Sequence, residues 1–305
     1  MARHRPILLA GATASGKSAL ALKLAAELNG TIINADALQV YDCWQVLSAR
    51  PDAADLAAAP HALYGHVAYD TPYSVGAWLR DIAPLLDNPA QTPIIIGGTG
   101  LYFSALTEGL ADIPQVPDEV RRHGNALRES GGAAGFVEIL QKSDPASLAR
   151  LDANNPMRLQ RAWEVLKTTG KGLAAWQDDA SPPLLPLDNC NSYVINVETA
   201  VLDARISHRF DQMLDRGALE EARAAIARGW DPSLPSSRAI GAGELVDVLN
   251  GVRDLPDAVA AAKRASRQYA KRQRSWFRNR MAHWTQLAYT SDAERQTALE
   301  VILSR

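Results

Sequence analysis

The chain has 305 residues, of which 47% are hydrophobic and 22% are charged, and its net charge is −2 at pH 7. This length and apolar content predict one large globular domain, or a core with a smaller domain added to it. The composition argues against a transmembrane protein, because no apolar run approaches the roughly 20 residues that span a bilayer, and we expect a cytoplasmic monomer. Cys43 and Cys190 are too few for a disulfide framework or a four-thiolate zinc site.

The first predicted elements enclose a glycine-rich loop. Residues 6–10 form a short apolar run that is typical of a buried parallel strand, and residues 19–28 have the composition of a helix. In the pattern Gly-x-x-x-x-Gly-Lys-Ser/Thr the backbone N–H groups converge on phosphate oxygens, the lysine reaches the distal phosphate and the final hydroxyl can bind Mg²⁺. ATP, GTP and other pyrophosphate compounds all fit this pattern. The loop that matches it is Gly11-Ala12-Thr13-Ala14-Ser15-Gly16-Lys17-Ser18.

Two further predicted strands lead to polar residues at the same edge of a sheet. The apolar stretch 31–36 ends in Asp36, and the apolar stretch 93–96 is followed by the turn Gly97-Gly98-Thr99-Gly100. Because ligands of open parallel sheets bind beyond the carboxyl ends of the strands, we expect Asp36 and Thr99 beside the bound phosphates. A turn or N-cap role for Asp36 and a simple tight turn at 97–100 stay open. The strand at 93–96 lacks the terminal aspartate that would hold Mg²⁺ in an ordinary ATPase. This weakens the interpretation of the chain as an ATPase.

The rest of the chain is predicted to be mostly helical. Helical patterns at 116–128, 133–141, 145–151 and 155–167 predict a helical insertion in a parallel α/β sheet, which resumes with a strand at 193–197. Arg205 and Arg209 then lie one turn apart on one helix face, where they could face an anion or only solvent. Residues 257–279 form a long helix, and eight Lys or Arg but no acid lie between residues 263 and 280. Its interleaved aromatic residues suit RNA, and a solvated helix with an aromatic core stripe is the alternative.

Together these motifs resemble the bacterial tRNA dimethylallyltransferases, also called tRNA isopentenyltransferases, because six motifs occur in the family's order. They are Gly11 to Ser18, Asp36-x-x-Gln39-Val40-Tyr41, Gly97-Gly98-Thr99-Gly100-Leu101-Tyr102, Arg158-x-x-Arg161-Ala162-x-Glu164-Val165, Arg205-Ile206-x-x-Arg209-Phe210-Asp211-x-Met213-Leu214 and Gln268-x-Ala270-Lys271-Arg272-Gln273. The resemblance implies a P-loop NTPase-like α/β core at residues 1–113 and 187–305. It also implies a small all-helical insertion domain at 114–186 that contacts tRNA.

The resemblance further implies an activity. A dimethylallyl group would pass from dimethylallyl diphosphate to N6 of the adenosine on the 3′ side of the anticodon, with release of diphosphate and without nucleotide hydrolysis. The loop at 11–18 would hold the donor diphosphate, and Lys17, Thr99 and Mg²⁺ at Ser18 would stabilise the leaving group. Asp36 resembles the family's base, which accepts a proton from N6. Either Arg205 or Arg209 is a candidate for a second clamp on the diphosphate.

A further group of positions resembles the family's tRNA contacts, and Gln39 is expected to contact the edge of the flipped-out adenine. The basic helix adds Lys271 and Arg272 as candidate contacts to RNA phosphates. The positions that match are Asp36, Ala37, Leu38, Gln39, Thr99, Arg121, Met157, Arg158, Leu159, Gln160, Arg161, Arg238, Ala239, Ile240, Gly241, Ala242 and Gly243.

The chain also departs from the family's pattern. Where the family has Asp-Ser-x-Gln and Asn-Asp-Pro, this sequence has Asp36-Ala37-Leu38-Gln39 and Asn154-Asn155-Pro156. Where the family has Gly-Tyr-Lys/Arg-Glu/Gln, it has Gly241-Ala242-Gly243-Glu244, which removes an aromatic ring and a cation from an expected RNA contact. The cysteines of the C-terminal zinc finger found in some relatives are missing.

On the residues alone, two other classes of protein stay open. The first is a P-loop kinase of a small metabolite, which would consume ATP. The second is a non-catalytic RNA-binding or nucleotide-switch protein, which would tolerate the loss of Asp36.

Overall fold

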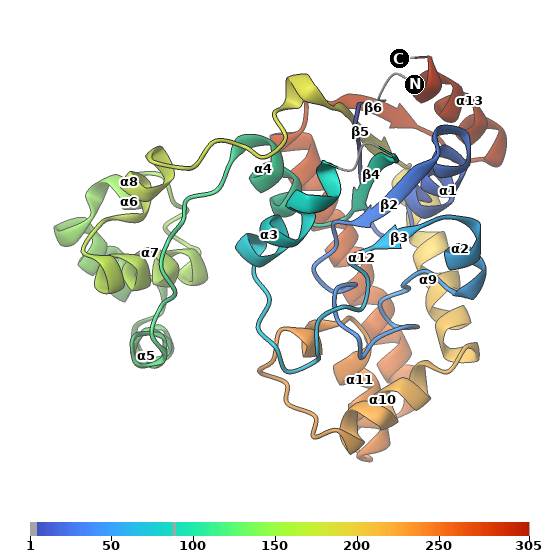
Figure 1. Ribbon diagram of the computed structural model, residues 1–305. Helices are drawn as coiled ribbons and strands as arrows, with labels where there is room; N and C mark the ends of the chain where they lie inside the picture. The colour runs from blue at the N-terminus through green and yellow to red at the C-terminus, as the bar shows by residue number, and fades with distance from the viewer. Residues whose placement is uncertain (1–4, 88–89, 305) are drawn as a thin grey trace. The chain divides into compact units, whose positions relative to one another are not determined.

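The computed structural model describes residues 5–87 and 90–304 (Figure 1). Over these residues six parallel strands form one sheet in the order β3-β2-β4-β1-β5-β6, which confirms the predicted α/β fold. The described chain divides into two compact units, the first reaching to Thr107 and resuming at Leu184, the second spanning Glu108–Pro183. The strands are β1 (Ile7–Gly11), β2 (Gly30–Asn34), β3 (His61–Ala62), β4 (Thr92–Gly97), β5 (Asn191–Asn196) and β6 (Thr285–Ala288).

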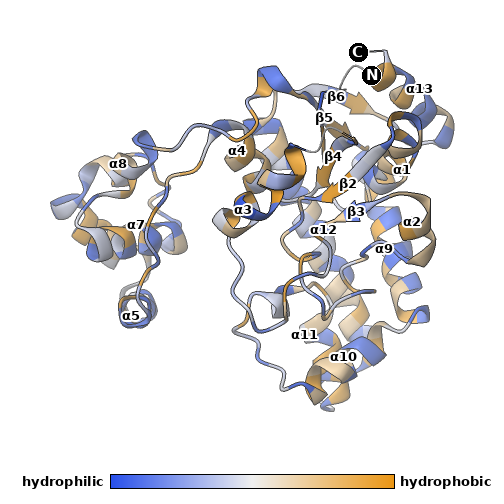
Figure 2. Cartoon of the chain, viewed as in Figure 1, coloured by the Kyte–Doolittle hydropathy of each residue, from blue (hydrophilic) through white to orange (hydrophobic). Residues whose placement is uncertain are grey.

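Helices cover both faces of this sheet, which is why the strands have continuous apolar sequences instead of alternating ones. In β1, Ile7 and Leu9 pack on one face, and Leu8 and Ala10 on the other. Hydrophobic residues gather accordingly in β2 and β4 (Figure 2). One face is covered by α1 (Lys17–Leu28), α9 (Thr199–Asp215) and α13 (Asp292–Leu303), and the other by α3 (Val75–Leu86), α4 (Gly100–Glu108) and the end of α12 (Leu255–Arg280).

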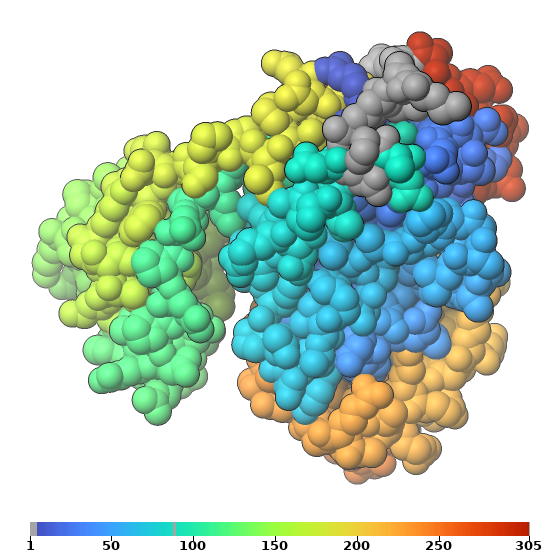
Figure 3. All heavy atoms as spheres, viewed as in Figure 1, coloured from blue at the N-terminus to red at the C-terminus, as the bar shows by residue number. Residues whose placement is uncertain are grey.

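A third apolar cluster joins the C-terminal helices to the segment that follows β2. This segment, residues 38–73, contains α2 (Ala53–Ala58) and packs on α10 (Ala218–Ala227) and α11 (Ala242–Leu249). Figure 3 shows the segment in light blue on the surface, next to the orange C-terminal helices. The Glu221 carboxylate accepts hydrogen bonds from the backbone N–H groups of Gln45, Val46 and Leu47 at 2.6, 2.7 and 2.9 Å. Glu221 therefore anchors residues 45–47, which follow Asp36 in the chain, to α10.

The second unit is built from four helices within its described residues, around a core of Phe136, Leu140, Leu159 and Trp163. The helical patterns expected at 116–128 and 133–141 are the two parts of one helix, interrupted at Gly132, whose φ of 57° suits glycine. The helices of the second unit are α5 (Asp118–Ser143), α6 (Pro145–Ala149), α7 (Pro156–Thr169) and α8 (Leu173–Asp178). Two short 3-10 helices, η1 (Leu187–Asn189) and η2 (Ser236–Arg238), belong to the first unit.

Strand β6 was not predicted, because residues after 201 were expected to be mostly helical. It is short and only Leu287 is buried, so it carries no clear apolar alternation. Its pairing with β5 at the edge of the sheet makes it a strand. Among the described helices, none combines the length and the apolar character needed to cross a membrane.

Candidate active site

The glycine-rich loop between β1 and α1 turns through left-handed backbone conformations. Ala14 has a φ of 60° and Gly16 a φ of 87°, and α1 begins directly afterwards at Lys17. A turn of this kind directs successive backbone N–H groups into one concavity at the positive end of a helix. Within the described part of the chain, the buried Ser15 hydroxyl has no hydrogen-bond partner. The loop therefore offers several N–H donors and one unpaired hydroxyl to an anion.

Lys17 folds back over this loop, with its Nζ 3.5 Å from the carbonyl oxygen of Ala12. Burial lowers the pKa of Lys17 to about 8, while the charge of Asp36 raises it and that of Arg209 lowers it further. Lys17 therefore lies close enough to Asp36 and Arg209 for their charges to matter. A bound anion would favour its charged form, because an opposite charge stabilises the ammonium.

The two candidate arginines of α9 make different contacts. The Arg209 guanidinium donates a hydrogen bond to Thr13 Oγ1 at 3.2 Å, inside the glycine-rich loop. Burial lowers the pKa of Arg209, and Asp36 acts in the opposite direction. Arg205 instead donates to the carbonyl oxygen of Thr290, in the segment after β6. Of the two, Arg209 is the one that contacts the loop.

Asp36 lies at the end of β2 and is held in a turn on both sides. Its N–H donates to the side-chain oxygen of buried Asn34 at 2.9 Å, and its Oδ1 accepts from the Leu38 N–H at 2.9 Å. The next N–H, of Ala37, donates to Thr99 Oγ1 at 3.0 Å, which ties this turn to the one after β4. The turn uses only Oδ1 of Asp36 and leaves Oδ2 available for a second role.

Two residues of α12 complete this arrangement, and sequence reasoning gave neither of them a role in the site, although Gln273 ends the sixth motif. The side-chain amide of Gln273 accepts from the Thr13 N–H and donates to the Gly98 carbonyl oxygen, both at 2.9 Å. One turn earlier, burial and the nearby Asp36 raise the pKa of Tyr269, and the side chains of Thr99 and Gln273 lie close enough to its hydroxyl to oppose this. The available signal was their spacing of four residues, which places both on one helix face. That spacing does not reveal what the face contacts.

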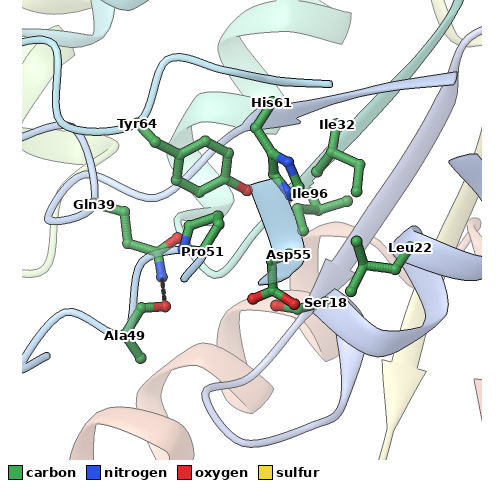
Figure 4. A pocket seen from close by; sticks show the side chains of 10 residues that line it. All are labelled: Ser18, Leu22, Ile32, Gln39, Ala49, Pro51, Asp55, His61, Tyr64 and Ile96. Atoms are coloured by element: carbon green, nitrogen blue, oxygen red, sulfur yellow. Dashed lines mark hydrogen bonds between the residues drawn. The ribbon is translucent and has the colours of Figure 1, made fainter. Parts of the chain in front are cut away.

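A cavity of about 30 Å³ adjoins the start of α1 (Figure 4). Gln39 lines it, but its Nε2 donates to the carbonyl oxygens of Ser48 and Ala49 at 2.9 Å each, so this nitrogen is engaged within the chain. Ser18 and Asp55 present oxygen atoms to the same cavity, and Mg²⁺ prefers oxygen ligands. The described residues contain no group of three or more His, Cys, Asp or Glu that could hold a metal by themselves. Ser18 and Asp55 therefore suit a cation that keeps water and substrate oxygens as its other ligands.

The positions of the first unit that resemble tRNA contacts differ in accessibility. Arg238, Lys271 and Arg272 are exposed, so their cations are available to a ligand. The remaining ones fall into two groups: Ala239, Gly241 and Ala242 are buried, and Asp36, Ala37, Leu38, Gln39, Thr99, Ile240 and Gly243 are partly exposed.

The corresponding positions of the second unit are divided in the same way. Arg121, Met157 and Arg158 are exposed. Leu159 and Gln160 are buried in the core of this unit, where the Gln160 amide donates to Asn125 and Glu164 at 2.8 Å each. Arg161 is partly buried; burial lowers its pKa, Glu164 opposes this and Arg121 adds to it. Arg121 and Arg161 thus place two neighbouring guanidinium groups on this unit.

The chain is similar to known proteins over nearly all of its length. The family model described as IPP transferase matches residues 39–280, and the one described as isopentenyl transferase matches residues 5–62. The tRNA dimethylallyltransferase of Cereibacter sphaeroides is 57% identical over 283 residues, which are 93% of this chain and 88% of the relative. That of Dinoroseobacter shibae is 56% identical over 285 residues, covering 93% of this chain and 95% of the relative.

Solved structures of similar proteins agree with these sequence comparisons. The full-length tRNA isopentenylpyrophosphate transferase of Bacillus halodurans is 31% identical, with a TM-score of 0.70 over 99% of this chain and 96% of that chain. A eukaryotic dimethylallyltransferase, solved acting on tRNA, is 25% identical, with a TM-score of 0.79 over 95% of this chain and 75% of that chain. The chain therefore belongs to the tRNA dimethylallyltransferase family, the family that its six sequence motifs resemble.

Proposed function

We propose that this protein transfers the dimethylallyl group of dimethylallyl diphosphate to N6 of the adenosine on the 3′ side of the anticodon in tRNA. The observation that carries the proposal is the convergence of an anion-binding loop and a carboxylate: Lys17 and Arg209 both lie within electrostatic range of Asp36. A phosphate cradle beside a proton acceptor suits a reaction in which a diphosphate leaves while a nucleophile loses a proton.

The donor diphosphate binds in the glycine-rich loop. Backbone N–H groups and the Ser15 hydroxyl contact its oxygens, Lys17 reaches the distal phosphate, and Arg209 approaches from α9 beside Thr13. Ser18, with Asp55 across the small cavity, would hold Mg²⁺, which supplies positive charge against the leaving group when bound. These groups stabilise the negative charge that develops on the diphosphate as it departs.

Asp36 acts as the general base. The N6 lone pair forms the new bond to C1 of the dimethylallyl group, the C1–O bond breaks, and its electron pair leaves with the diphosphate. An exocyclic amine that keeps both protons is a poor nucleophile, so one of them passes to the Asp36 carboxylate as the bond forms. Thr99 holds the turn that carries Asp36 through the Ala37 N–H, at 3.0 Å from its Oγ1.

The exposed cations of both units contact tRNA. Arg238, Lys271 and Arg272 on the first unit and Arg121 and Arg158 on the second are free to reach phosphate oxygens. The buried positions Leu159, Gln160, Ala239 and Ala242 support these contacts from within. The target adenine has to leave its stack in the anticodon loop to reach Asp36, so binding includes a flipped base.

The experiment that tests the proposal incubates the protein with dimethylallyl diphosphate, Mg²⁺ and unmodified tRNA, followed by nucleoside digestion and mass analysis. The expected product is an adenosine that is heavier by one five-carbon alkenyl unit, formed together with an equal amount of free diphosphate. Transfer of a phosphoryl group from ATP to a small acceptor, with no change in the tRNA, would refute the proposal in favour of a kinase.

A further inference from the structure

Helix α12 has one exposed face and one buried face, and Gln273 lies on the buried face. Its side chain is 5% exposed, whereas the neighbouring Lys271 and Arg272 are exposed. The amide joins two loops: Oε1 accepts from the N–H of Thr13, and Nε2 donates to the carbonyl oxygen of Gly98, both at 2.9 Å. One loop is the phosphate cradle, and the other is the glycine turn after β4.

This bridge requires a side chain that both donates and accepts, as an amide does at any pH. One end has to accept and the other has to donate, which a carboxylate, a thioether or an ammonium cannot do. The approach is also close: a Cβ at position 98 would lie 2.1 Å from Nε2 of Gln273, so a side chain there would displace this amide. On the same helix face, Tyr269 lies close enough to Thr99 of the same glycine turn for the Thr99 side chain to lower its pKa. The buried amide is therefore a direct side-chain link between two loops that already begin on neighbouring strands, because β1 pairs with β4.

Under the proposed function, each loop controls one of the two reacting centres. The phosphate cradle places the donor carbon, and Thr99 holds the turn that places the Asp36 carboxylate. We propose that Gln273 is a positioning residue for the transfer reaction: its amide holds the donor loop and the base loop at the distance at which the two centres can react. The role rests on the proposed function, and it assigns to Gln273 no contact with either substrate.

A positioning role predicts which kinetic parameter changes. A misplacement of about 1 Å at a reacting centre lowers the rate roughly 10²-fold. Lys17 contacts the Ala12 carbonyl oxygen without Gln273, and Arg209 contacts the side chain of Thr13, whereas Gln273 holds the Thr13 N–H, so both cations stay beside the cradle when the bridge is lost. Gln273→Met, which removes both hydrogen bonds without adding a charge, should lower kcat about 10²-fold and leave the Kd for inorganic diphosphate within about 3-fold.

The second variant, Gln273→Glu, tests the bridge through pH. An ionised Glu can accept from Thr13 but cannot donate to Gly98, whereas a protonated Glu can do both. Burial raises the pKa of a carboxyl group, so lowering the pH from about 8 to about 6 should re-form the bridge. The ratio of its kcat to that of the wild type should therefore rise about 10-fold or more over this interval. A general loss of packing would give a ratio that does not depend on pH.

The matched control is Gln212→Glu, the same chemical change at an exposed position of α9, and its kcat should follow that of the wild type at both pH values. A readout without catalysis is hydrogen exchange of peptides that contain Thr13, which should be faster in Gln273→Met than in the wild type. An unchanged exchange rate, a pH-independent ratio for Gln273→Glu, or equal losses in kcat and diphosphate binding for Gln273→Met would each overturn the proposal. If the wild type fails to modify tRNA, the proposed function is wrong, and the exchange measurement still decides whether the bridge exists.

Discussion

Replacing Asp36 with asparagine separates its chemistry from its structural role. The asparagine oxygen can still accept from the Leu38 N–H, which lies 2.9 Å from Oδ1 in the structure, so the turn should keep its shape. The substitution removes the proton acceptor, and loss of a general base lowers turnover roughly 10²–10⁴-fold. It also removes a negative charge beside Lys17 and Arg209. Inorganic diphosphate should therefore bind as tightly as to the wild type, or up to about 10-fold more tightly, which is about 1.4 kcal/mol.

Single-turnover formation of the modified nucleoside, with donor and tRNA both saturating, measures the first quantity, and titration calorimetry with inorganic diphosphate measures the second. Asp36→Ala serves as the comparison, because it also removes the hydrogen bond to Leu38 and should lose about 0.5–1.5 kcal/mol of folding stability. Turnover of Asp36→Asn within about 3-fold of the wild type would remove Asp36 from the role of base. Diphosphate binding weakened more than about 10-fold would mean that the carboxylate shapes the donor site instead.

Burial lowers the pKa of Lys17 to about 8, and an anion binds the charged ammonium better than the neutral amine. The affinity for inorganic diphosphate should therefore fall as the pH rises through about 8. In calorimetry, Lys17→Met should lose this component of the pH profile. Arg209→Ala should weaken diphosphate binding roughly 10–100-fold, as expected for a charge-assisted hydrogen bond, and Arg205→Ala should weaken it far less; equal losses would contradict the assignment of Arg209 to the loop. For exposed Lys271, Lys271→Gln should flatten the slope of log tRNA affinity against log salt by about one, and an unchanged slope would leave α12 outside the interface.

Local sequence determined the elements of the core. The strand, loop and helix around Gly11 to Ser18 could be predicted because each element depends on neighbours within a few residues: an apolar run, a glycine at position 16 that adopts a left-handed conformation, and a helix-forming stretch. The same holds for β2 before Asp36 and β4 before Thr99. Because the carboxyl ends of parallel strands share one edge of a sheet, their convergence followed from the order of the elements.

Tertiary structure alone decided which distant side chains complete this edge. Gln273 meets Thr13 across 260 residues of sequence, and the helical period identifies the buried face of α12 without identifying its partner. The same period placed Arg205 and Arg209 on one face, and only the packing of α9 against the loop and the segment after β6 separates their contacts. The helical period indicates which side chains of a helix are buried. Which residues they pack against depends on contacts between segments that are far apart in the sequence, and no local pattern specifies those contacts.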